Sequence, residues 1–228
     1  MNDNAIISII IPTLNEAKFI RKTLKKVQSL PGNFEFIVVD GRSSDGTAEA
    51  VAETGVKLVS TARGRGPQMN AGACAASGNV LLFLHADTAL PENAYELVQD
   101  ALQKEEIGGG CFRLKFDSRR PMLRFYSFCS RIPCSFFQYG DCAYFVRTEI
   151  FQEIGGFKSF PLMEDVDFWR RLKKRCKTVV LRQAVTVSAR RFLKYGAVRQ
   201  QLRSAFLLLL YLLGIHPTKL KKFYPDVR

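Results

Sequence analysis

Short apolar segments alternate with amphipathic ones along the first hundred residues. Four segments rich in β-branched, aliphatic or aromatic side chains predict strands: residues 6–11, 34–39, 56–59 and 79–84. Three segments between them have helical spacing or helix-start signals and predict helices: residues 17–30, 45–53 and 68–76. This alternation predicts an α/β fold with a mostly parallel sheet and right-handed crossovers.

The pattern changes after residue 105. Residues 111–116 alternate between apolar and polar side chains and predict a half-exposed strand that follows the glycines at 108–110. Another strand is predicted at 143–146, so we expect the sheet to acquire mixed strands here. Three further helices are predicted in this half: residues 121–131, 166–175 and 197–213.

Composition is that of a folded domain with a basic end. The chain has 228 residues, of which 47% are hydrophobic, enough for a substantial core. Residues 170–228 hold 16 of the 34 basic residues and only one acid, Asp226, whereas the rest of the chain is close to neutral. We therefore expect one domain over residues 1–188 and a basic, amphipathic helical extension over 189–228 that is not an independent domain.

Cysteine spacing and the lengths of the apolar runs indicate in which cellular compartment the protein works. The six cysteines form no CxxC pair, which argues against a zinc site or a disulfide framework and favours a reducing cytoplasm. The apolar run at 6–11 is too short for a signal-peptide core. The longest run, residues 205–213, is far below the roughly 20 residues that span a bilayer. Such a segment can lie on the inner face of a membrane without crossing it.

Polar residues follow three of the predicted strands, at 12–16, 40–47 and 85–87. The carboxyl ends of parallel strands share one edge of a sheet, which is where ligands bind in open α/β folds. The chain lacks both the GxGxxG and the GxxxxGK[ST] glycine patterns, which argues against a dinucleotide-dependent dehydrogenase or a P-loop enzyme.

The segment His85-Ala86-Asp87 supports two interpretations. Alternate residues of an extended chain share a face, so His85 and Asp87 could reach one hard cation that holds a diphosphate. The same residues could instead form a polar turn in which Asp87 or Thr88 caps the next helix.

Five ordered motifs carry a resemblance to a known family. They are Ser8–Glu16, Val38–Thr47, Asn70–Gly72, Leu84–Asp87 and Glu164–Phe168. Together they resemble the family 2 glycosyltransferases, whose GT-A fold is a Rossmann-like, mainly parallel mixed sheet flanked by helices. The chain's end, Phe223–Arg228, is similar to that of a bacterial subgroup associated with arsenosugar biosynthesis. The resemblance implies inverting transfer of a sugar, from a UDP-linked donor, to a hydroxyl acceptor.

The family's donor-site residues map onto the first motifs. By this resemblance Pro12, Thr13 and Glu16 line the nucleoside pocket, and Asp40 hydrogen-bonds the base. Members commonly have two consecutive acids where this chain has Asp40-Gly41, so the resemblance does not identify the base of the donor nucleotide. Arg65 matches a basic residue that faces the donor phosphates; without the resemblance it reads as a solvated loop arginine.

The metal motif departs from the family. Its usual Asp-x-Asp is His85-Ala86-Asp87 here, so Asp87 inherits the role of ligand for Mg²⁺ or Mn²⁺. An imidazole beside it shifts the preference toward Mn²⁺. Alternatively, His85 hydrogen-bonds a donor phosphate or hydroxyl, or is a structural histidine.

The family assigns the acceptor side to the last motif. Asp165 matches the general base that takes the proton of the attacking hydroxyl, with Glu164 beside it. Asp141 lies in Tyr139-Gly140-Asp141, where members often contact the acceptor. Without the resemblance, the acids at 164–167 read as residues that the helix dipole favours at a helix start.

The basic C-terminal quarter is compatible with more than one kind of partner. The apolar run at 206–213 with Arg199 and Arg203 is typical of a segment that adsorbs to an anionic membrane. It could equally pack on the domain or on a second copy in a homodimer. No nucleic-acid motif is present. A rival function is a non-catalytic nucleotide- or membrane-binding protein that retains the GT-A fold.

Overall fold

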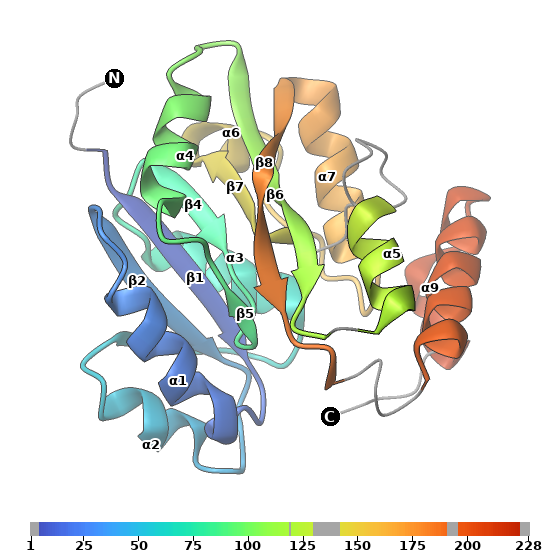
Figure 1. Ribbon diagram of the computed structural model, residues 1–228, viewed down its shortest axis with the longest axis horizontal. Helices are drawn as coiled ribbons and strands as arrows, with labels where there is room; N and C mark the ends of the chain where they lie inside the picture. Colours follow the sequence, from blue (N-terminus) through green and yellow to red (C-terminus); the bar gives the residue numbers. More distant parts are fainter. Residues whose placement is uncertain (1–4, 119, 130–141, 191–195, 224–228) are drawn as a thin grey trace.

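The computed structural model describes residues 5–118, 120–129, 142–190 and 196–223 (Figure 1). One eight-stranded sheet with the order β3-β2-β1-β4-β7-β6-β8-β5 forms the centre, with helices on both faces (Figure 1). The strands are β1 Ile7–Thr13, β2 Phe34–Asp40, β3 Lys57–Ser60, β4 Val80–Phe83, β5 Thr88–Ala89, β6 Ile107–Phe116, β7 Tyr144–Arg147 and β8 Lys177–Val187. The helices are α1 Ala17–Gln28, α2 Thr47–Ala52, α3 Arg65–Ala75, α4 Ala94–Leu102, α5 Pro121–Cys129, α6 Thr148–Glu153, α7 Glu164–Arg175, α9 Ala197–Leu212 and α10 Pro217–Leu220.

The first half of the chain forms the parallel part of the sheet, as predicted. Strand β1 lies between β2 and β4, is parallel to both, and is buried at every residue. Burial on both faces explains why β1 and β4 are continuous apolar runs rather than alternating ones. The register pairs Thr13 with Asp40, so the carboxyl ends of β1 and β2 meet at the same edge.

The second half adds the mixed strands that the sequence predicts. Strand β7 is antiparallel to β4 and β6, and β8 is parallel to β6. The prediction that the alternating strand begins at 111 was wrong, because β6 already begins at Ile107 and includes the three glycines. A Cβ on Gly109 would lie 2.6 Å from the carbonyl oxygen of Phe145, so the glycine lets β6 approach β7 closely.

The segment after β4 is a turn, not an extended strand. Strand β4 ends at Phe83, and the Thr88 amide donates to the His85 carbonyl at 3.0 Å. The expectation that His85 and Asp87 share one face of an extended chain is therefore wrong. The capping alternative is wrong as well, because α4 begins only at Ala94 and has no side-chain cap.

Paired hydrogen bonds place α7 against α3. The Asn70 side chain donates to the Phe157 carbonyl at 2.8 Å and accepts from the Phe157 amide at 2.9 Å. The Phe157 ring stacks on Phe168 of α7, with centroids 4.2 Å apart, and meets Phe83 of β4 edge to face. These contacts hold the start of α7 beside the strand-end edge of the sheet.

Helix α9 packs beside α5 with one face toward the domain (Figure 1). Leu207 and Leu208 are buried on that face. None of the helices within the described residues is long and apolar enough to span a bilayer.

A partly exposed carboxylate joins the amino ends of the central strands. Glu35 of β2 accepts hydrogen bonds from the Ser8 hydroxyl of β1 and from the Ser77 amide at 2.8 Å. Burial by itself raises the pKa of Glu35, but these hydrogen bonds outweigh it and hold the pKa below 4.5. A carboxylate with a lowered pKa stabilises the fold above its unfolded-state value and loses that contribution as the pH falls.

We expect Glu35→Gln to lower the free energy of unfolding by about 1–2 kcal/mol at pH 7, because a charged acceptor is lost. The deficit should shrink as the pH falls through the usual glutamate range, because the unfolded chain takes up a proton there before the folded carboxylate, whose pKa is lowered, does so. Urea denaturation at pH 7, 5 and 3.5 measures both effects. A deficit that stays constant across this range would contradict the account.

Candidate active site

A buried glutamine organises the ends of the first two strands. Gln68 of α3 donates from its side-chain amide to the carbonyls of Thr13, at 2.7 Å, and Val39, at 2.8 Å. Asp40, at the end of β2, is 4% exposed and accepts from the amide of Ser43 at 2.9 Å and from its hydroxyl. The strand ends and the Asp40 carboxylate are thus held in one geometry.

The loop after β2 is hydrogen-bonded to the start of α1. Asp45 accepts from the amides of Ala17 and Thr47, each at 3.1 Å. The Thr47 hydroxyl accepts from the Glu16 amide at 2.9 Å. Burial raises the pKa of Asp45, but the hydrogen bonds from Thr47 and Ala17 together outweigh it and lower the pKa. The residues at 12–16 and 40–47 therefore form one wall.

Arg190 joins two of the predicted site residues. Its Nη2 lies 2.8 and 2.9 Å from the two carboxylate oxygens of Glu16, and its Nε lies 3.1 Å from Oδ2 of Asp87. Its guanidinium also lies 4.3 Å from the ring centroid of Phe19. Burial lowers the pKa of Arg190, but Glu16 and Asp87 outweigh burial and raise it. The group stays cationic.

A second arginine joins the other predicted residues. Arg65, in the first turn of α3, contacts the ring nitrogens of His85, and its Nε lies 3.4 Å from Oε1 of Glu164. Glu164 and the neighbouring Asp165 are buried in the first turn of α7. Asp165 Oδ1 accepts from the Val166 amide at 2.8 Å.

The predicted residues thus fall into two linked groups at one sheet edge. Thr13, Glu16, Asp40 and Asp87 border one side, where Pro12 is buried too; Arg65, His85, Glu164 and Asp165 border the other. Asp141 lies outside the described residues. Sequence reasoning missed Gln68 and Arg190: the only signal for Gln68 is a polar residue in a small-residue helix, and Arg190 is one cation in a basic run.

His85 and Asp87 suit a divalent cation by type. Mg²⁺ sites that hold phosphates often use only one or two carboxylates from the protein, and an imidazole favours Mn²⁺. Asp87 already forms an ion pair with the Arg190 guanidinium, so its carboxylate can stabilise a positive charge at this position. A metal ion there would compete with Arg190 for Asp87. Within the described part of the chain, no group of three or more His, Cys, Asp or Glu side chains is arranged so that it could hold a metal ion.

Comparison with known proteins gives a family and a fold. The family model described as glycosyl transferase family 2 matches residues 8–159. The chain is 28% identical over 193 residues to the probable glycosyltransferase YdaM of Bacillus subtilis, across 73% of this chain and 46% of that relative. It therefore spans less than half of that protein's length.

Two solved structures have a similar fold. The mannosyltransferase PcManGT of Pyrobaculum calidifontis, in complex with GDP-Man and Mn²⁺, has a TM-score of 0.70 and 19% identity, over 97% of this chain and 68% of that one. The glucosyl-3-phosphoglycerate synthase of Mycobacterium tuberculosis, in complex with Mn²⁺, UDP-Glc and phosphoglyceric acid, has a TM-score of 0.67 and 18% identity, over 98% and 82%. These similarities confirm the predicted GT-A fold.

We expect the ion pair of Glu16 with Arg190 to be energetically coupled, because the Glu16 side chain is only 3% exposed. A double-mutant cycle of Glu16→Gln and Arg190→Gln, read by urea denaturation, should give a coupling free energy of about 2 kcal/mol. The control cycle uses the exposed pair of Arg21 with Glu53, where we expect less than about 1 kcal/mol. Equal coupling in the two cycles would show that burial adds nothing at Arg190.

Proposed function

Because this chain belongs to glycosyl transferase family 2, we propose that it transfers a sugar from a nucleotide-linked donor to a hydroxyl group of an acceptor. The observation that supports this most is the gathering of acids and arginines at one sheet edge. There Asp40, Asp87 and Asp165 come from three distant segments, with two guanidinium groups beside them.

The donor nucleoside would lie along the wall formed by residues 12–16 and 40–47. Pro12, Thr13 and Glu16 would line it, and Asp40 would accept a hydrogen bond from the base. A uracil ring offers one imide N–H donor to such a carboxylate, so we propose a UDP-linked donor. The two solved relatives bind GDP-Man and UDP-Glc, respectively, so the base requires a test.

The donor diphosphate would lie between Arg65 and Arg190. Arginine donates in a fixed planar fork that suits phosphate oxygens, and both guanidinium groups already face the acids of the site. Asp87 and His85 would hold Mn²⁺ or Mg²⁺, which when bound neutralises charge on the departing diphosphate. Arg190 would then pair less with Asp87 and would donate hydrogen bonds to the phosphate oxygens instead.

The acceptor hydroxyl would be deprotonated by Asp165. Its carboxylate is buried at the start of α7 and oriented by the Val166 amide, which keeps one oxygen in a defined direction. Removal of the proton by Asp165 as the hydroxyl attacks gives inversion in a single displacement. Glu164, held by Arg65, and Asp141 would contact the acceptor.

We place the transfer site in a domain over residues 1–188, and the extension over 189–228 contributes Arg190 to it. Along α9 an apolar stripe is exposed: Val198, Leu202, Phe206, Leu209 and Leu213, which are between 50% and 71% exposed. Arg199 and Arg203 lie in the same helix. We propose that the stripe and these cations hold the protein on the inner, anionic face of a membrane. The similarity to the arsenosugar subgroup suggests a more specific role, which stays a prediction.

A non-catalytic nucleotide-binding protein is the second candidate. Two observations favour it. His85 has an imidazole at a position where the family has a carboxylate, and Asp87 is paired with Arg190. Such a protein would bind nucleotide without turnover.

We expect Asp165→Asn to lower the transfer rate by about 10²–10⁴-fold, because the amide cannot accept the hydroxyl proton. Release of UDP from a panel of UDP-sugars with Mn²⁺ measures the rate, and UDP binding should stay unchanged. Asp100→Asn, an exposed acid of α4, is the matched control. Nucleotide binding by the wild-type protein with no turnover of any donor would favour the second candidate.

We expect the wild-type protein to sediment with vesicles of phosphatidylglycerol in phosphatidylcholine, and less so as salt is added. Removing the charges in Arg199→Ala/Arg203→Ala should weaken binding by about tenfold or more, since each cation near such a surface adds about 1 kcal/mol. Lys22→Ala/Lys25→Ala, two exposed cations of α1, is the control. A dimer that forms with rising concentration and no vesicle binding would contradict membrane contact.

A further inference from the structure

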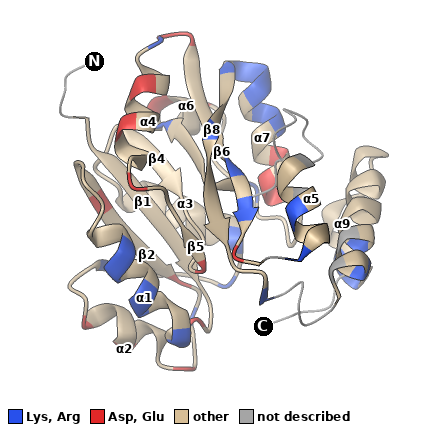
Figure 2. Cartoon of the chain, viewed as in Figure 1, with Lys and Arg blue, Asp and Glu red and all other residues tan. Residues whose placement is uncertain are grey.

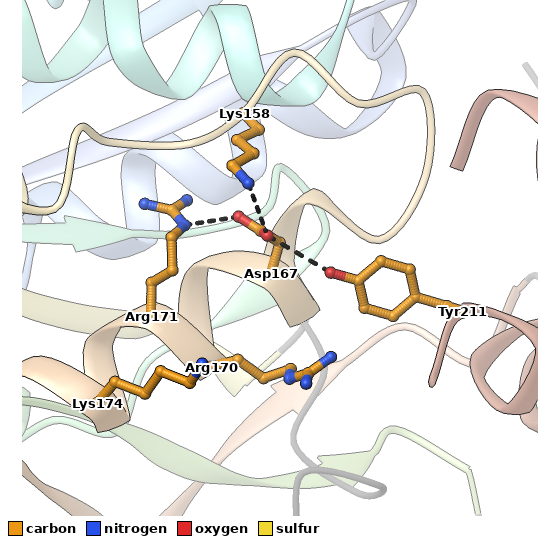
Figure 3. Close-up of a pocket in the computed structure, with 6 residues that line it drawn as sticks. All are labelled: Lys158, Asp167, Arg170, Arg171, Lys174 and Tyr211. Carbon is orange, nitrogen blue, oxygen red and sulfur yellow. Dashed lines mark hydrogen bonds and ion pairs between the residues drawn. The ribbon is translucent and has the colours of Figure 1, made fainter. Parts of the chain in front are cut away.

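A cationic pocket lies between α7 and α9, apart from the residues assigned above (Figure 3). It has a volume of about 270 Å³. Its lining consists of Lys158, Asp167, Arg170, Arg171, Lys174 and Tyr211. Four cationic groups thus face a single carboxylate. Figure 2 shows the same imbalance along α7, where acids stand at the start and Lys and Arg follow toward the end.

The carboxylate in the pocket is already neutralised. Asp167 Oδ2 lies 2.6 Å from Nε of Arg171, and its Oδ1 lies 3.4 Å from Nζ of Lys158 (Figure 3). Arg171 also donates to the carbonyls of Ile154 and Gly156, so the ion pair with Asp167 is part of the fold. Charge on Asp167 therefore does not balance the remaining cations.

Arg170 and Lys174 supply the excess charge. They are exposed and lie four residues apart on α7, so they face the same side of the helix. Within the described residues neither has a carboxylate partner. The Arg170 guanidinium lies 5.9 Å from the ring centroid of Tyr211.

Tyr211 provides a neutral donor at the pocket wall. Its hydroxyl donates to Asp167 at 3.4 Å (Figure 3). Burial, together with the nearby Asp167 charge, raises the pKa of Tyr211, so the phenol keeps its proton. The wall contributed by α9 therefore adds no negative charge that would repel an anion.

The pocket adjoins the candidate active site. Asp167 lies one turn beyond Glu164 in α7. On the other side, a Cβ on Gly66 would collide with the carbonyl oxygen of Lys158, so the Lys158 backbone packs against the start of α3, next to Arg65. A ligand in the pocket would therefore lie beside the acceptor side of the transfer site.

We propose that this pocket binds a phosphate-like anionic group of the acceptor, with Arg170, Lys174 and Lys158 as its donors. Guanidinium and ammonium groups form charge-assisted hydrogen bonds with phosphate oxygens, about twice as strong as neutral ones. The link to an acceptor rests on the proposed function, whereas anion binding by the pocket does not. The phosphate could belong to a lipid headgroup or to a soluble phosphate monoester.

The test measures binding of three probes by the full chain: glycerol 3-phosphate, glycerol, and vesicles of phosphatidic acid in phosphatidylcholine. We expect Arg170→Ala/Lys174→Ala to weaken binding of the anionic probe by about tenfold or more, since two charge-assisted contacts are lost. Lys22→Ala/Lys25→Ala removes the same charge from an exposed face of α1 and should bind as the wild type does. Glycerol should not bind. Circular dichroism checks that each variant is folded.

Each outcome has one meaning. Binding of glycerol 3-phosphate that is weakened in Arg170→Ala/Lys174→Ala supports a soluble phosphate. Because α9 itself is proposed to contact anionic vesicles, binding of phosphatidic acid vesicles alone supports a lipid headgroup only where it is weakened in the same variant. Equal affinity in the Arg170/Lys174 variant and the wild type, or no binding of either anionic probe, overturns the proposal. Failure of the proposed function is a separate result, because it would be the absence of sugar transfer in the wild type with phosphate affinity intact.

Discussion

Burial of β1 between two parallel neighbours is the constraint on which the rest of the structure depends. Every residue of β1 is buried, so the strand is largely apolar, and its polar residues are Ser8, which donates to Glu35, and Thr13 at its carboxyl end. The register with β2 and β4 then brings those ends to one edge of the sheet. A buried amide, that of Gln68, joins two of the ends by donating to the backbone carbonyls of Thr13 and Val39. The packing of the core therefore also determines the geometry of the site.

Ion pairs at this edge join residues that are far apart in the sequence. Arg190 reaches Glu16 across 174 residues, and Arg65 reaches Glu164 from the start of α3. The buried acids Glu16 and Glu164 each meet a guanidinium, whereas an unpaired charge in this low-dielectric environment would be costly. The same guanidinium groups suit a diphosphate, so these ion pairs are suited to exchange partners with a charged ligand. The cationic pocket between α7 and α9 extends this positive surface toward the proposed acceptor side.

Much of the fold could be predicted because burial imposes short-range patterns. The apolar runs of β1, β2 and β4 and the amphipathic α1 are such patterns. Strand β8 was not predicted, because its exposed and buried residues do not alternate regularly. The start of β6 was misplaced because glycines usually mark turns, whereas Gly109 is there for close approach to β7. The role of Arg190 depends on contacts distant in sequence, which local spacing cannot show.

A crystal structure of the protein with UDP and Mn²⁺ tests the central claim most directly. The account predicts the uracil ring against Asp40 and the diphosphate between Arg65 and Arg190, with Asp87 turned from Arg190 toward the metal ion. Nucleotide bound elsewhere on the molecule, with Arg190 still paired to both Glu16 and Asp87, would contradict it.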